Sequence, residues 1–292
     1  MRVLITLFVL SLCAPVAHAQ SWQVVDGSQT TLRGAMACAL GGGADDYCFA
    51  LGCTEKLPLH FGYYSRGIGS DRPVVPVEVS VDGTSRGRLL MENRDPGTGA
   101  ELVAIWDKES HDYLREALAG GQVLTLLVDP SGAGVERRIP LSGSSAALQA
   151  ALAQCPTGPR RVSDPVALEK AGMEADCASM GDGGVSYGEE FARQVDFDFD
   201  GKDDIVIDLG GAQCAGTTSM FCGSAGCSRS YWHAEEGGYR QVMSTYAYTE
   251  EFRQRPIMIL KQHGNVCDRV GVETCTSTFE WTGEGFELIG RE

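Results

Sequence analysis

The first half of the chain alternates apolar and polar positions in short runs, as antiparallel strands do when one face packs on a core. The clearest run is Val74 to Val81, a β-branched stretch that ends at the turn dipeptide Asp82-Gly83. Helical spacing replaces this alternation at 110–119, before Gly120-Gly121, and again at 144–154. The strands expected here cover residues 22–25, 57–64, 74–81, 86–93, 101–107, 123–128 and 135–139.

The second half is expected to begin with one helix and to continue as strands. Ser163-Asp164-Pro165 predicts a helix start, because Ser or Asp caps the first turn and proline suits its first position. We expect this helix to reach about Cys177. The strands that follow are expected at 190–195, 205–209, 230–233, 239–243, 256–262, 276–281 and 286–289. Antiparallel β structure explains this half best.

A stretch rich in proline separates the two halves. Pro156, Gly158 and Pro159 disfavour regular structure, so we expect a linker at 156–164. The predicted fold is therefore mainly β (α+β), with two β-rich domains. The first, residues 20–155, is expected to be sandwich-like or barrel-like with two short helices. The second, residues 165–292, is expected to be an antiparallel β domain with one N-terminal helix.

The N-terminus has the pattern of a secretory signal peptide. Arg2 precedes an apolar run from Val3 to Leu12, and Ala17-His18-Ala19 places small residues at the sites before a cut. This run is too short to span a bilayer, and no later segment approaches eighteen apolar residues. We therefore predict removal of residues 1–19, export to the periplasm or beyond, and no transmembrane segment in the mature chain.

The cysteines and the charge agree with export. Of eleven cysteines, Cys13 would leave with the signal peptide, and an even number in an exported chain predicts disulfides. Four lie before the linker and six after it, namely Cys38, Cys48, Cys53 and Cys155, then Cys177, Cys214, Cys222, Cys227, Cys267 and Cys275. Spacing favours the pairs Cys222–Cys227 and Cys267–Cys275 and leaves the other pairings open.

The chain carries a formal charge of -15, or -16 once Arg2 is removed with residues 1–19, which hold no acid. An acidic surface disfavours nucleic acid and favours cations and basic partners. The same charge also serves simply to keep an exported protein in solution.

Residues 21–155 resemble the invasion-associated locus B family of exported bacterial proteins. The residues that carry the resemblance are the early cysteines, Trp22-Gln23-Val24-Val25, Val79-Ser80-Val81-Asp82-Gly83, Leu114 to Gly121, Ile139-Pro140-Leu141-Ser142-Gly143 and Ala146 to Leu152. The resemblance implies a compact β-rich domain in a cell-envelope protein linked to interaction or stress, and it supplies no catalytic residues.

One stretch carries a specific chemical signal, the acidic loop from Asp196 to Asp204. Its carboxylates stand at positions 1, 3, 5 and 9 and glycine at 6, which suits a hard cation such as calcium. A helical calcium hand would need Glu at position 12, where Ile207 stands, and the residues around Ile207 are β-branched. We therefore expect a loop that joins two strands.

This loop resembles the calcium loops of FG-GAP and VCBS-type repeats. The resemblance implies side-chain ligands from Asp196, Asp198, Asp200 and Asp204, and a carbonyl ligand from Lys202. Asp203 would point away. The alternative is an acidic turn without a metal, although four convergent carboxylates would then repel one another.

Other chemistry has weaker support in the sequence. No two histidines stand at zinc-ligand spacing. The Gly-x-Ser-x-Gly pattern occurs at Gly83–Gly87 and Gly184–Gly188, but in neither place does an expected strand lead into an expected helix, as a nucleophile elbow requires. Glu235-Glu236 precedes Gly237-Gly238 and is interpreted as a solvated hairpin tip. Five aromatic residues are either core or a ligand surface, namely Trp232, Tyr239, Tyr246, Tyr248 and Trp281.

The favoured hypothesis is an exported, non-catalytic protein with a structural calcium ion that binds a protein or another component of the envelope. The alternative is a periplasmic hydrolase, or an inhibitor of an envelope hydrolase, with a cleft between the domains. A stress or stability protein without a discrete ligand is a third hypothesis.

Overall fold

The computed structural model describes residues 21–28, 30–39, 46–129, 134–181, 183–216, 220–253, 256–270 and 273–292. The predicted signal peptide lies outside the described residues. The described chain is mainly β with three α-helices, which confirms the expected fold class. Within these ranges no helix has both the length and the apolar composition that crossing a membrane requires.

The first part of the chain forms one nine-stranded antiparallel sheet. Its strands are β1 (Gln23–Asp26), β2 (Arg33–Ala39), β3 (Tyr47–Cys53), β4 (His60–Ser65), β5 (Val74–Val81), β6 (Thr84–Asn93), β7 (Glu101–Ile105), β8 (Val123–Val128) and β9 (Val135–Pro140). They lie in the order β1-β2-β3-β4-β7-β6-β5-β8-β9. The sheet curls like a barrel and brings β9 close to β3. The Tyr47 hydroxyl in β3 donates a hydrogen bond to the Arg138 carbonyl in β9 at 2.7 Å.

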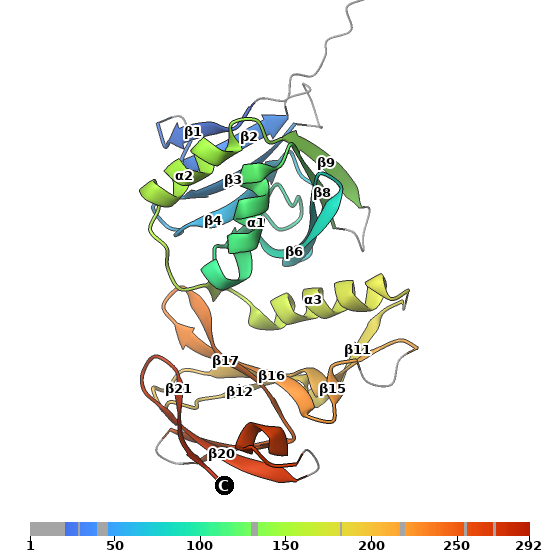
Figure 1. Ribbon diagram of the computed structural model, residues 1–292, viewed down its shortest axis with the longest axis vertical. Coiled ribbons are helices and arrows are strands. Elements are labelled where there is room, and N and C mark those ends of the chain that lie inside the picture. Colours follow the sequence, from blue (N-terminus) through green and yellow to red (C-terminus); the bar gives the residue numbers. More distant parts are fainter. Residues whose placement is uncertain are drawn as a thin grey trace, which may run out of the picture.

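Two helices cover this sheet, as the sequence predicts. They are α1 (Lys108–Gly120) and α2 (Ser144–Gln154), and they lie beside each other over the strands (Figure 1). Asp107 caps α1 by accepting a hydrogen bond from the Ser110 amide at 2.9 Å. Leu114, Leu118, Leu148 and Ala151 of the helices are buried against the inner face of the sheet and close the first hydrophobic core.

The second part contains two further antiparallel sheets and a small pair of strands. A six-stranded sheet holds β10 (Arg161–Val162), β12 (Ala192–Val195), β13 (Asp204–Asp208), β15 (Cys222–Gly223), β16 (Gly226–Glu235) and β17 (Gly238–Ala247). A four-stranded sheet holds β18 (Thr249–Arg253), β19 (Ile257–His263), β20 (Thr274–Trp281) and β21 (Phe286–Arg291). The remaining pair is β11 (Val185–Tyr187) with β14 (Ala212–Cys214).

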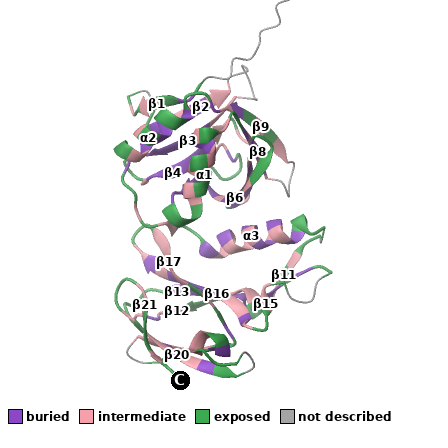
Figure 2. Cartoon of the chain, viewed as in Figure 1, coloured by how far each residue is buried: buried purple, intermediate pink, exposed green. Residues whose placement is uncertain are grey.

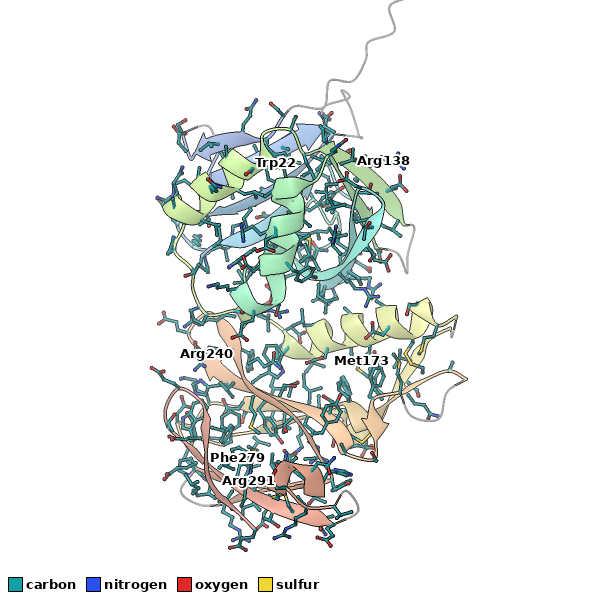
Figure 3. All side chains as sticks on the ribbon, viewed as in Figure 1. Trp22, Arg138, Met173, Arg240, Phe279 and Arg291 are labelled. Carbon is teal, nitrogen blue, oxygen red and sulfur yellow. A yellow bond between two sulfur atoms is a disulfide. The ribbon has the colours of Figure 1, made fainter. Side chains whose placement is uncertain are left out.

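The six-stranded and four-stranded sheets pack face to face (Figure 1). Phe279 and Arg291, labelled in Figure 3, belong to the four-stranded sheet. Between the two sheets lies a core that we call the aromatic core. It consists of Phe197, Val206, Tyr231, Ala247, Met258 and Leu260, with Phe252, Trp281 and Phe286 packed against it.

The third helix, α3 (Pro165–Ser179), lies between the nine-stranded and six-stranded sheets (Figure 1). Asp164 caps it by accepting from the Ala167 amide at 2.9 Å, as the sequence predicts. Leu168 and Met173 of α3, the latter labelled in Figure 3, belong to one buried cluster with Trp232 of the six-stranded sheet and Val74 of β5. Figure 2 shows buried positions, in purple, at intervals along α3. The same helix therefore contributes to the packing of both parts.

Polar contacts join the two parts beside α3. The Arg72 guanidinium donates to Glu174 at 2.6 Å, and Arg88 donates to Asp176 at 2.7 Å. The expected linker at 156–164 is not entirely irregular, because its residues Arg161–Val162 form β10 and pair with β17. The segment between the parts is therefore partly held by strand pairing.

The ten described cysteines form five disulfides, and none joins the two parts. Both pairs favoured by spacing, Cys222–Cys227 and Cys267–Cys275, are confirmed. The pairings left open are Cys38–Cys48, Cys53–Cys155 and Cys177–Cys214.

Three strands of five or more residues escape the sequence analysis, as do the short strands β10, β11, β14 and β15. Two are β2 and β3, whose sequences RGAMACA and YCFALGC contain many small residues and few β-branched ones. The third is β18, with the charged sequence TEEFR. Their strand conformation depends on pairing with neighbours in the folded chain.

Candidate metal site

The acidic loop connects β12 to β13, two neighbouring antiparallel strands of the six-stranded sheet, as predicted. Val195 pairs with Asp204 as the last residues of the ladder, so the turn runs from Asp196 to Asp203. This strand-loop-strand geometry agrees with the β-branched residues that follow the loop, and it excludes a helical calcium hand at this position.

Hydrogen bonds within the loop hold three of its carboxylates against backbone amides of the turn. Asp198 Oδ1 accepts from the Asp200 amide at 3.1 Å, and Asp200 Oδ1 accepts from the Lys202 amide at 2.8 Å. Asp196 Oδ2 accepts from the Gly201 amide across the loop at 3.1 Å. Gly201 has φ +86°, a left-handed conformation that glycine adopts without steric cost, so the sharp turn falls where the sequence places it.

Carboxylate oxygens from three of the predicted ligands converge. One oxygen each from Asp196, Asp198 and Asp204 lies within 4.8 Å of the other two. Calcium binds oxygen at 2.3–2.6 Å, so two ligands of one ion lie at most about 5 Å apart. In addition, Asp196 Oδ1 is buried and has no hydrogen-bond partner among the described residues. The residues present therefore fit a hard dication.

Asp204 is the innermost carboxylate of the loop. It is fully buried, and it accepts from the Phe197 amide at 3.1 Å and from the Ala234 amide at 2.8 Å. Burial nevertheless raises the pKa of the Asp204 carboxyl to about 6. A bound dication would favour the ionised form and offset that cost of burial.

Phe197, at position 2 of the loop, anchors it to the aromatic core. Its side chain is 1% exposed, and its ring centre lies 5.0 Å from that of Phe286 and 5.4 Å from that of Trp281. Because Phe286 and Trp281 belong to the four-stranded sheet, the position of the loop is coupled to the packing of both sheets.

Asp200 and Lys202 stand apart from this trio. Asp200 is exposed, and its Oδ2 accepts from the Lys202 ammonium at 2.7 Å. Its carboxylate groups with Asp198 and His233, whereas Asp196 and Asp204 belong to the other set of three. The carbonyl ligand expected from Lys202 stays a prediction. Asp203 is exposed and belongs to neither set, in agreement with its expected outward direction.

The sequence analysis missed His233, which lies beside the loop. Its Nε2 is 2.9 Å from Asp198 Oδ2. His233 belongs to β16, and the pairing of Ile205 with Trp232 brings it level with the start of β13. No spacing in the sequence marks this contact, because only the pairing of the strands creates it.

Glu236 is exposed at the tip of the β16–β17 hairpin, as expected, but the interpretation of Glu235 as solvated is wrong. Its side chain is 16% exposed, and its two oxygens accept from Arg161 at 2.6 Å and Arg240 at 2.5 Å. Arg240 is labelled in Figure 3, on β17. Pairing of β10 with β17 brings Arg161 to this position, so two guanidinium groups form ion pairs with Glu235 beside the hairpin tip.

The five aromatic residues considered for a ligand surface divide between core and surface. Trp232 is buried beneath α3, and Trp281 packs against the aromatic core. Tyr239 is half-buried. Tyr246 is 54% exposed and Tyr248 36% exposed, so these two remain available on the surface of the described chain.

An open groove of about 1040 Å³ lies at one end of the nine-stranded sheet. Its described lining residues fall between Asp26 and Glu101, so it belongs to the first part of the chain. Arg33, Lys56 and Arg94 line it together with acids and hydroxyls, and its described lining contains no histidine to act on a serine. It is not the cleft between the parts that the hydrolase hypothesis predicts.

No known protein family, no curated protein and no solved structure matches this chain.

Proposed function

We propose that this chain is an exported, non-catalytic protein that binds a partner in the cell envelope or outside the cell, and that its second part carries a structural calcium ion. The observation that supports the ion is the convergence of Asp196, Asp198 and Asp204, with the buried Asp196 Oδ1 left without a partner. Calcium matches this donor set, because it prefers several oxygen ligands with negative charge.

The role assigned to the ion is to fix the β12–β13 turn against the aromatic core. An ion that binds only the folded chain raises the free energy of unfolding, by roughly 2.7 kcal/mol at a hundred times its dissociation constant. For a chain of this size that gain corresponds to a rise of roughly 5–10 °C in melting temperature.

The test compares the thermal unfolding of the full chain in calcium with that in a chelator. The variants are Asp198→Asn, which removes a central ligand, and Asp203→Asn, a matched change at an exposed position in the same loop. We expect calcium to raise the melting temperature of the wild type and of Asp203→Asn, and to have little effect on Asp198→Asn. Equal melting of the wild type in calcium and in chelator would contradict the proposal.

The binding role rests on the resemblance of residues 21–155 to the invasion-associated locus B family, on the acidic charge and on exposed aromatic surface. Tyr246 offers a specific position, since it is 54% exposed on β17. A photo-crosslinker at Tyr246, used in intact cells, is expected to capture a partner. Tyr113, 49% exposed on α1, is the second test position, in the part that carries the resemblance. Failure to capture any specific partner from either position would favour a stability protein instead.

A further inference from the structure

His233 is held rigidly against the acidic loop by aromatic packing. Its ring centre lies 4.8 Å from that of Trp281 and 6.1 Å from that of Phe197, and its side chain is 12% exposed. This packing aims Nε2 at Asp198 Oδ2, 2.9 Å away, and places Nδ1 3.7 Å from Glu235 Oε1. Each ring nitrogen therefore faces a carboxylate.

Neither neutral form of the ring suits both carboxylates. A proton on Nε2 makes a hydrogen bond to Asp198, but it leaves the buried Nδ1 without a donor and directs its lone pair at Glu235. A proton on Nδ1 faces Glu235 favourably, but then the Nε2 lone pair lies 2.9 Å from an oxygen of Asp198. A second proton on the ring satisfies both carboxylates, and so does a metal cation between Nε2 and Asp198, which would take both atoms as its ligands.

The geometry around Nε2 suits such an ion. Nε2 and one oxygen each of Asp198 and Asp200 lie within 4.8 Å of one another. Two ligand atoms 2.9 Å apart that each bind an ion at about 2.1 Å subtend an angle of about 90° at it, as octahedral ligands do, and the tetrahedral angle usual for zinc needs them to separate to about 3.4 Å. Behind the ring, Nδ1 lies 3.7 Å from Glu235 Oε1 and makes no hydrogen bond.

The donor set distinguishes this position from the calcium position. Calcium takes oxygen ligands, whereas imidazole nitrogen together with carboxylate suits zinc and related transition-metal ions. At present the Lys202 ammonium lies on Asp200 Oδ2, and its side chain is 60% exposed. It can therefore move into water when a dication takes its place.

We propose that Asp198, Asp200 and His233 form a second cation position at the loop, which takes a transition-metal dication of the zinc type through His233 Nε2. This inference rests on the proposed metal site to the extent that the two positions share Asp198. It adds a ligand from β16 and a second class of ion that the loop sequence does not indicate.

The test measures zinc and calcium affinities separately on the full, chelator-treated chain. His233→Gln keeps the size of the side chain but replaces the imidazole nitrogen, and His263→Gln is the matched control, on β19 outside both sets of ligands. We expect His233→Gln to weaken zinc binding at least about tenfold more than calcium binding, because losing even a residue behind a metal ligand typically costs about tenfold or more. His263→Gln is expected to change neither affinity.

A second readout identifies the ligand atom. In protein labelled with 15N-histidine, the His233 Nε2 resonance is identified as the one missing from the spectrum of His233→Gln. Zinc is expected to shift this resonance. If that variant does not fold, Asp200→Asn at the exposed ligand provides the same comparison, with zinc weakened more than calcium. Equal weakening of zinc and calcium in these variants would overturn the proposal, because His233 would then only position Asp198.

The outcomes separate this inference from the proposed function. Stabilisation by calcium with zinc binding independent of His233 leaves the structural calcium ion standing and refutes the second position. Zinc binding that depends on His233, without any response to calcium, supports the second position and refutes the calcium ion.

Discussion

Lowering the pH is expected to destabilise the first part of the chain through one histidine, His111 on α1. Its ring lies edge-on to Phe61 with 5.6 Å between ring centres, and its Nδ1 accepts a hydrogen bond from the Asp107 amide at 3.0 Å. A proton on Nδ1 would break that bond. Burial, and next the nearby Arg160 guanidinium, lower the pKa of His111 to about 4.

The sign and size follow from this shift. The unfolded chain takes up the proton near pH 6.5, whereas the folded chain resists it until about pH 4. The contribution of His111 to stability is therefore complete above pH 6.5 and lost as the pH falls to 4. At about 1.36 kcal/mol per pH unit, the difference between 6.5 and about 4 amounts to about 3 kcal/mol.

The assay is urea unfolding at several pH values between 7.5 and 4, followed by tryptophan fluorescence. Trp106 is a local probe, because its ring centre lies 5.9 Å from that of His111. The variant His111→Gln keeps an acceptor for the Asp107 amide but cannot titrate, and His263→Gln controls for the loss of a histidine elsewhere. We expect the stability of wild type to fall toward that of His111→Gln as the pH drops. Parallel curves for these two proteins would refute the reasoning.

Three further predictions concern the core, the turn and a disulfide. Phe197→Ala should lower the free energy of unfolding by about 3–5 kcal/mol and weaken calcium binding. Phe199→Ala, at a 55% exposed position of the same loop, should change both quantities little. Denaturant titrations with and without calcium compare the two variants. Gly201→Ala meets no atom within 4 Å but keeps φ +86°, so we expect a cost of about 1–2 kcal/mol from backbone strain alone and weaker calcium binding by calorimetry. Replacing both Cys53 and Cys155 by serine removes a disulfide between residues 102 positions apart in the sequence. We expect the free energy of reversible unfolding to fall by about 4–5 kcal/mol. An unchanged denaturation midpoint would contradict this expectation.

Local signals in the sequence predicted the elements that depend on local chemistry. The β-branched run of β5 and the capped start of α3 lie where their residues place them, and the acidic loop keeps its strand-loop-strand form because Ile207 and its neighbours favour a strand. The small residues of β2 and β3 carry no such signal, and only pairing between Cys38 and Cys48 and their neighbours makes them strands. The order of the nine strands likewise depends on packing across the whole sheet.

The candidate site divides in the same way. Asp196, Asp198 and Asp204 could be predicted because nine consecutive residues contain them all. His233 comes from a strand that pairs with β13 only in the folded chain, so no motif could include it. Asp200 has a predicted position, but its pairing with Lys202 and its place beside His233 depend on side-chain packing.

The placement of α3 has a consequence for cleavage of the chain. A protease cut at 156–160 breaks the backbone between the parts, and no disulfide of the described cysteines spans that cut. Yet Val74 of the first part is buried in a cluster with α3, and Arg72 and Arg88 bind its acids. The two fragments should therefore migrate as one particle in native buffer and separate in urea without any reductant.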